Sequence, residues 1–238
     1  MKKLLLSLFT VLSLSVFAQD TKIITDANAV TRTLNGSFTA IDVSSGVELH
    51  ITKGSTESIA VSANNEKHLE RFKTEVVNGV LKIYYDNKGI TWKSEAKRLK
   101  AYVSYKTLER LHASAGSDVK VNGNIEATDF KLTVSSGAEF TGTIQATNLV
   151  TDVSSGASAK VSGKADKLTI EVSSGADFKG YDFVVDYCDA SASSGAAVHV
   201  TINKELNAKA SSGADIKFKG TGLIRDIKTS SGGAVKKA

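Results

Sequence analysis

Apolar residues recur in fixed columns through the second half of the chain. When the chain is aligned on a repeated Ser-Ser-Gly segment, the position three residues after each glycine is apolar in every copy: Val119, Phe140, Ala159, Phe178, Val198, Ile216 and Val235. The positions three and five residues before each glycine are also mostly apolar or small. Alternating columns predict β-strands with one face on a core. Because the columns recur in every copy, we expect equivalent strands to stack in parallel.

The repeated segment marks the corners between these strands. Its first copy is Ser114-Ala115-Gly116, and six Ser-Ser-Gly copies follow, with glycines at Gly137, Gly156, Gly175, Gly195, Gly213 and Gly232. The glycine-to-glycine steps are 21, 19, 19, 20, 18 and 19 residues. A period near 20 with a fixed turn signal predicts a solenoid, and glycine accepts the backbone conformation of a sharp bend. We expect an all-β protein with a parallel, right-handed β-helix of two or three short strands per rung, and we favour a three-sided coil.

Residues 36–110 carry a looser form of the same alternation. Apolar positions two or four residues apart predict strands, and Asn78-Gly79 predicts a type I′ hairpin turn. Residues 64–72 are the one stretch with helical character. We interpret this segment as a β-meander that caps the first rung of a coil formed by residues 111–238. Ser44-Ser45-Gly46 is an early, isolated copy of the corner segment.

The N-terminus reads as an export signal. Basic Met1-Lys2-Lys3 is followed by an apolar run over residues 4–17, with Val16 and Ala18 at the cleavage positions. We predict a signal peptide over residues 1–18, an extended lead-in over 19–35, and export through the Sec pathway to the periplasm, the cell surface or the medium. An uncleaved anchor is the alternative, although the run is short for a spanning helix.

Composition narrows the function classes. The formal charge of +5 falls to +3 when Lys2 and Lys3 are removed, and acids and bases are interspersed. A nucleic-acid partner is therefore not expected, because such proteins concentrate basic residues in a patch. No later apolar run is long enough for a second membrane span. Cys188 is the only cysteine, which excludes an intramolecular disulfide and predicts a small buried side chain.

Two outward columns could bind a ligand. The position two residues after the glycine holds acids at Asp118, Glu139, Asp177 and Asp215, and the position four residues after it holds bases at Lys120, Lys160, Lys179, His199 and Lys217. The functional interpretation is a strip that binds a charged polysaccharide or a divalent cation. The structural interpretation is a solvated face of mutually screening charges, each pair worth about 0–1 kcal/mol. Trp92, which is followed closely by the charged residues Lys93 and Glu95, is the best single candidate for an exposed contact.

Glycan cleavage is the enzymatic alternative. Asp118 and Glu139 would lie on adjacent rungs, about 5 Å apart, and glycosidases need two carboxyl groups about 5–9.5 Å apart. The rungs differ in length by only three residues, however, so no long loop is present to build the walls of a cleft. The four histidines show no metal-ligand spacing. We therefore expect no catalytic residue, no cofactor and no metal.

Several segments in order resemble the bacterial exported head GIN domain family, described as auto-transporter adhesins. They are residues 38–51 followed by Lys53-Gly54, residues 74–83, residues 99–105 and the repeats. The resemblance implies a β-helix-like fold and an exported location, and it supplies no catalytic residues. The leading function is non-catalytic binding or adhesion at the cell envelope, with a glycan or an envelope protein as partner. A glycan-active enzyme and a purely structural envelope protein are the alternatives.

Overall fold

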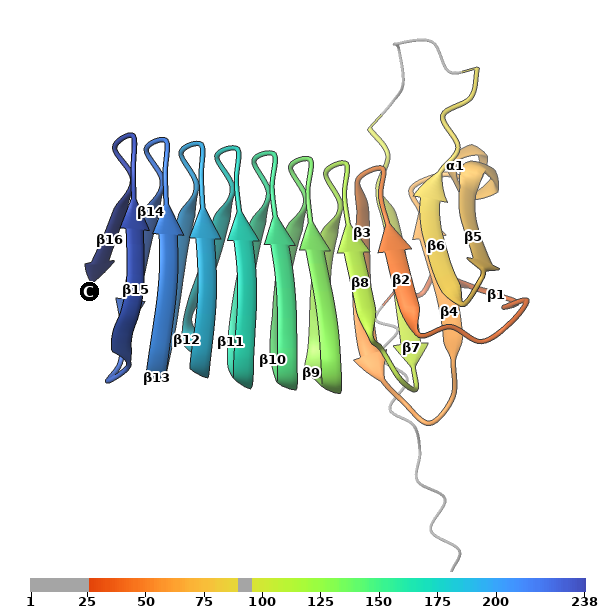
Figure 1. The fold of residues 1–238 in the computed structure, drawn as a ribbon. Helices are drawn as coiled ribbons and strands as arrows, with labels where there is room; N and C mark the ends of the chain where they lie inside the picture. Colours follow the sequence, from red (N-terminus) through yellow and green to blue (C-terminus); the bar gives the residue numbers. More distant parts are fainter. Residues whose placement is uncertain (1–25, 90–95) are drawn as a thin grey trace, which may run out of the picture.

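The computed structural model describes residues 26–89 and 96–238, which form a rod of stacked β-rungs (Figure 1). The predicted signal peptide, the start of the lead-in and Trp92 lie outside the described residues. The repeating part consists of β9 (Asp118–Val134), β10 (Glu139–Val153), β11 (Ser158–Val172), β12 (Asp177–Ala192), β13 (Ala197–Ala210), β14 (Asp215–Lys219), β15 (Leu223–Thr229) and β16 (Ala234–Lys237). All neighbours in this stack pair in parallel, which confirms the predicted β-solenoid.

The predicted apolar column is a physical stack. The strand registers align Val119 with Phe140, and then Ala159, Phe178, Val198, Ile216 and Val235 in succession. The members from Val119 to Ile216 are buried, and Val235 packs against the core at its end. Each rung thus covers the apolar face of the one before it, because a single rung cannot bury that face alone.

Backbone pairing between β9 and β10 falls into three runs. In β10 the runs that pair with β9 are residues 139–141, 143–146 and 148–153. Buried positions are Phe140 and Ile144 in the first two runs and Leu149 and Val153 in the last, so the inward parity changes near residue 147. A change of parity requires a bend, because successive side chains on a strand point to opposite faces. With β11 on its other side, β10 pairs continuously over residues 139–146 and again over 148–153, so the bend near residue 147 is common to both pairings and the three-sided form stays a prediction.

Each Ser-Ser-Gly corner is a tight turn with two left-handed residues. In the corner after β9, φ is 53° at Ser136 and 69° at Gly137, and the Ala138 N–H donates to the Ser135 carbonyl over 3.1 Å. Positive φ at both central residues is the type I′ geometry. The Gly137 N–H donates to the carbonyl of Ser155 in the next rung over 3.0 Å, so the hydrogen-bond ladder runs through the corner.

Residues 36–110 are not a simple β-meander, because two of their strands pair in parallel with their neighbours and form part of the solenoid stack. β2 (Ala40–Val43) and β3 (Val47–Lys53) form a rung around Ser44-Ser45-Gly46. The Gly46 N–H donates to the Ala115 carbonyl over 3.0 Å, so this copy of the corner belongs to the stack and is not isolated. The physical reason is that residues around Gly46 follow the same inward columns as the later rungs.

The rung of β2 and β3 is enclosed by strands that come later in the chain. β6 (Val80–Tyr85) and β8 (Arg110–Ala113) flank β2, and both pairings are parallel. β7 (Leu99–Tyr105) and β9 flank β3, again in parallel. The β6–β7 rung therefore lies on the outer side of the β2–β3 rung, and β8 begins the rung on its inner side (Figure 1).

Antiparallel strands and one helix cover the N-terminal end of the rod. β4 (Ser58–Ala63) pairs with β7 and with β1 (Val30–Arg32) of the lead-in, and β5 (Phe72–Val77) forms the predicted hairpin with β6. Asn65 caps the N-terminus of the helix α1 (Glu66–Arg71), and its side chain accepts a hydrogen bond from the His68 N–H over 2.9 Å. No helix in residues 26–89 and 96–238 is long and apolar enough to cross a bilayer.

Candidate functional site

The structure places the predicted site residues in two straight rows on one face of the solenoid. Strand registers align the acids Glu48, Asp118, Glu139, Asp177 and Asp215, and beside them the bases His50, Lys120, Lys160, Lys179, His199 and Lys217. We call these two rows the charged columns. Adjacent members lie about 4.8 Å apart, which is the strand spacing. Ser158 and Ala197 interrupt the acid row.

Two members of the charged columns, Glu48 and His50, are not among the residues that the sequence analysis selects. They stand two and four residues after Gly46, at the same offsets as the later acids and bases. Extending the glycine alignment to Ser44-Ser45-Gly46 would have identified both. Trp92 lies outside the described residues, so the structure does not place it relative to the columns.

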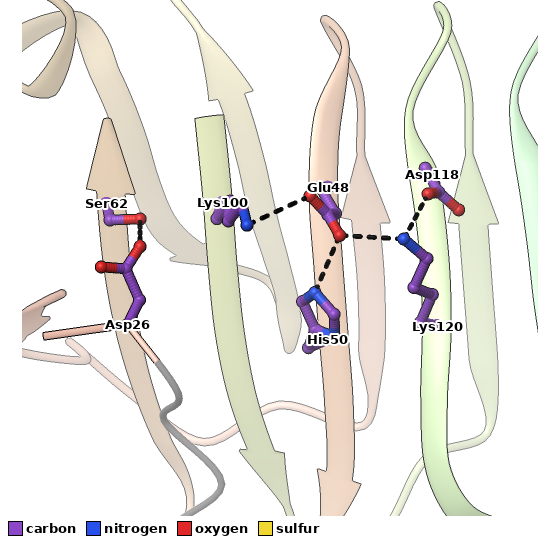
Figure 2. Close-up of polar contacts among 7 residues, drawn as sticks. All are labelled: Asp26, Glu48, His50, Ser62, Lys100, Asp118 and Lys120. Carbon is purple, nitrogen blue, oxygen red and sulfur yellow. Dashed lines mark hydrogen bonds and ion pairs between the residues drawn. The ribbon is translucent and has the colours of Figure 1, made fainter. Parts of the chain in front are cut away.

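Glu48 lies at the centre of the densest group of charges (Figure 2). Its carboxylate lies 2.9 Å from Lys120 Nζ, 3.7 Å from Lys100 Nζ and 3.1 Å from His50 Nε2. Lys120 Nζ also lies 2.9 Å from the Asp118 carboxylate. The hydrogen bond from Lys120 lowers the pKa of Glu48, and the same bond raises the pKa of Lys120. Both groups therefore stay charged through the neutral pH range.

Aromatic and neutral polar groups extend this cluster. The His50 ring stacks on Tyr102 with centroids 5.2 Å apart. On the neighbouring strand β4, the Ser62 hydroxyl donates to the Asp26 carboxylate over 2.5 Å and lowers its pKa (Figure 2). The bond to Glu48 and the stacking on Tyr102 hold the His50 ring in its row.

Further along the rod, Asp177 and Asp215 each pair with the lysine on their own strand. Lys179 lies 3.3 Å from Asp177, and Lys217 lies 3.0 Å from Asp215. His199 Nδ1 lies 3.6 Å from the Asp177 carboxylate, and its ring contacts Tyr181 with centroids 5.0 Å apart. Residues two apart on a strand share a face, so this pairing follows from the sequence spacing.

Glu139 and Lys160 differ from the rest of the charged columns. Within the described part of the chain, neither has an ion pair or a side-chain hydrogen bond. They lie on neighbouring strands, because Glu139 aligns with Ser158 and Lys160 with Thr141. The middle of the rows thus offers an acid and a base that are free to contact a partner.

The chemistry of the charged columns is that of a flat binding surface. Each exposed ion pair contributes only about 0–1 kcal/mol to stability, so partner charges can replace it at little cost. The part of the chain that the structure describes contains no group of three or more His, Cys, Asp or Glu side chains that could hold a metal ion. Several weak, evenly spaced contacts are what such a surface can offer to a ligand.

The fold has clear counterparts. Residues 37–222 match the family model described as "Putative auto-transporter adhesin, head GIN domain". A protein of Bacteroides fragilis described as a putative adhesin is 13% identical, with a TM-score of 0.75 over 90% of this chain and 98% of that chain. A Parabacteroides distasonis protein described as a putative lipid binding protein is 17% identical, with a TM-score of 0.70 over 90% and 98%.

A third solved structure extends this agreement. A putative adhesin of Parabacteroides merdae is 14% identical, with a TM-score of 0.70 over 90% of this chain and 97% of that chain. A search of curated proteins finds no match to the sequence. At these identities the likeness to the solved structures shows the fold alone.

Proposed function

Because the chain belongs to this head GIN domain family, we propose that it is an exported, non-catalytic binding module of the cell envelope. Its partner, a charged glycan or an envelope protein, binds across the charged columns. The observation that carries the proposal is the register: bases on neighbouring strands, such as Lys160 and Lys179, stand side by side on one rigid face. A partner with evenly spaced charges meets several of them at once.

Affinity on such a flat surface comes from the number of weak contacts rather than from burial of the ligand in a deep pocket. One exposed pair is worth little, but linked contacts act together, because the first contact holds the next ones at a high effective concentration. The backbone hydrogen bonds between rungs favour such linked contacts, because they fix the spacing of the charged side chains before the partner binds. Rungs of nearly equal length leave this face without walls, which favours binding over catalysis.

The test compares two matched lysine variants. Lys160 lies in the charged columns, whereas Lys131 is an exposed lysine on another face, and neither has an ion pair in the described residues. We expect Lys160→Glu to weaken binding of the mature protein to envelope extracts and to polyuronates, and Lys131→Glu to leave it unchanged. Binding should also fall as salt rises, because exposed charges are screened. Equal loss in both variants, or no binding by the intact protein, would refute the proposal.

A further inference from the structure

A second face of the solenoid has a shallow hollow that the charged columns do not reach. It lies over the last pairing run of each rung, in β11, β12, β13 and β15, on the other side of the Ser-Ser-Gly corners. The volume of the hollow is about 390 Å³. Its outward lining forms two rows: Thr169, Asp189, Asn207 and Asp226, and beside them Glu171, Ser191, Lys209 and Lys228.

The hollow exists because small residues interrupt a row of long ones. Ser191 lies between Glu171 and Lys209 in register, so these two side chains stand about 10 Å apart across it, at two strand spacings. The inward neighbours Ala190 and Ala208 are small as well. Neither the Glu171 nor the Lys209 side chain has a hydrogen bond or ion pair to another described residue. A carboxylate and an ammonium group therefore border the hollow without a partner in the protein.

The polar groups in the middle of the hollow are held in fixed positions. Asn207 Nδ2 donates to Asp189 Oδ1 over 2.8 Å, and Lys167 Nζ lies 3.5 Å from the other oxygen of the same carboxylate. The two side chains come from neighbouring strands, because Asp189 aligns with Asn207. Fixed carboxylate and amide groups are the kind of polar contacts that orient a small ligand in a pocket.

An exposed aromatic residue, Tyr187, lies outside the lining of the hollow but next to it along β12. Tyr187 precedes Asp189 by two residues on β12 and so shares its face, and 46% of its surface is exposed. Lys204 Nζ lies 2.7 Å from the Asp186 carboxylate and 5.4 Å from the centroid of the Tyr187 ring. Val150, which is 45% exposed and lies in register with Thr169, also belongs to this face. A tyrosine combines an apolar body with a polar tip, which suits contact with a ligand that has both.

We propose that this face binds a neutral oligosaccharide of two or three hexose units. The apolar C–H face of one sugar packs on Tyr187, and the hydroxyl groups of the next bond to Asp189, Asn207 and Lys209. The four-residue span from Tyr187 to Ser191 is about 13 Å at strand rise, long enough for such a chain. The site goes beyond the function proposed above, because it uses a different face and an uncharged ligand.

The experiment measures the binding of defined sugars to the intact mature protein. The probes are cellotriose, maltotriose, mannotriose and chitotriose, titrated calorimetrically at low and high salt. We expect at least one to bind, with an affinity that salt does not change. Tyr187→Ala should then weaken that binding by at least tenfold, Asp189→Asn should weaken it as well, and Tyr187→Phe should retain it.

The matched control is Tyr181→Ala, because Tyr181 is a tyrosine on the side of the charged columns. Retained binding in this variant supports the hollow as the site. If none of the four sugars binds, if Tyr187→Ala binds as the parent does, or if Tyr181→Ala loses binding, the inference is overturned. Those outcomes leave the charged columns untouched, because their test depends on Lys160 and on salt.

Discussion

The two left-handed residues in each corner offer the sharpest test of how this rod is held together. Ala115 has a φ of 48°, in the position that serine occupies in the later corners. A Cβ in this conformation costs about 1–2 kcal/mol, and alanine lacks the short polar side chain that can offset part of that cost. Ala115→Gly removes the strain but gives the unfolded chain more freedom, worth about 0.4–1 kcal/mol. We expect a net stabilisation of about 0.5–1 kcal/mol.

The opposite change should have the opposite sign. Gly156 has a φ of 69°, and no atom lies within 4 Å of a Cβ built there, so steric contact contributes nothing. The left-handed conformation costs alanine about 1–2 kcal/mol, of which about 0.4–1 kcal/mol is offset because alanine makes the unfolded chain less free, so Gly156→Ala should destabilise the protein by about 0.5–1 kcal/mol. Ala127→Gly is the control, because Ala127 lies within β9 and is not among the left-handed residues. Glycine there should destabilise the protein by about 0.5–1 kcal/mol.

Thermal and urea unfolding of the protein would measure all three variants. For a chain of this size, 1 kcal/mol corresponds to roughly 2–4 °C in Tm. We expect Tm to rise for Ala115→Gly and to fall for Gly156→Ala and Ala127→Gly. If glycine lowered Tm at position 115, or if alanine were neutral at position 156, backbone strain could not be what selects the corner residues.

Three further outcomes follow from burial and charge. Phe178→Ala empties a fully buried position between Ala159 and Val198 and should cost about 3–5 kcal/mol, seen as a large fall in Tm. The hydrogen bond from Lys120 lowers the pKa of Glu48 in the folded protein below its ordinary value of 4.5. The ionised Glu48 therefore stabilises the fold at pH values above 4.5, and this stabilisation is lost as the pH falls through the lower pKa of the folded state. Glu48→Gln should therefore cost about 0.5–1 kcal/mol at neutral pH and nothing in strong acid, by urea unfolding at several pH values. Burial raises the pKa of Cys188 to about 12, so iodoacetamide should label it only after unfolding; rapid labelling of the folded protein would contradict its buried position.

Much of the solenoid could be predicted from the sequence because its signals are local. The offset of three residues from each glycine identifies Val119, Phe140 and their equivalents as core, and the registers stack them in that order. The offsets of two and four residues likewise place Asp118 and Lys120 in the charged columns. Side-chain alternation on a strand is a matter of backbone geometry, so it transfers directly from sequence to structure.

The order of the first rungs could not be predicted in the same way. Alternation tells which side chains of β2 and β3 face inward, but it does not tell which strands lie beside them. Gly46 precedes Gly116 by 70 residues, and the segment between them supplies the rung on the far side. The hollow beside Tyr187 was also beyond sequence reasoning. It depends on Ser191 standing between Glu171 and Lys209, three residues that come together only through register.

The enclosed rung has a consequence for the order of folding. β9 and β10 meet across a loop of about 19 residues, whereas β2 must wait for β8, about 70 residues later. Closing the longer loop costs about 1 kcal/mol more in chain entropy, because that cost grows with the logarithm of loop length. We infer that the strands synthesised first are completed late, after the central rungs have formed a template. An exported chain would therefore keep its leading segment open until the segment that follows has emerged.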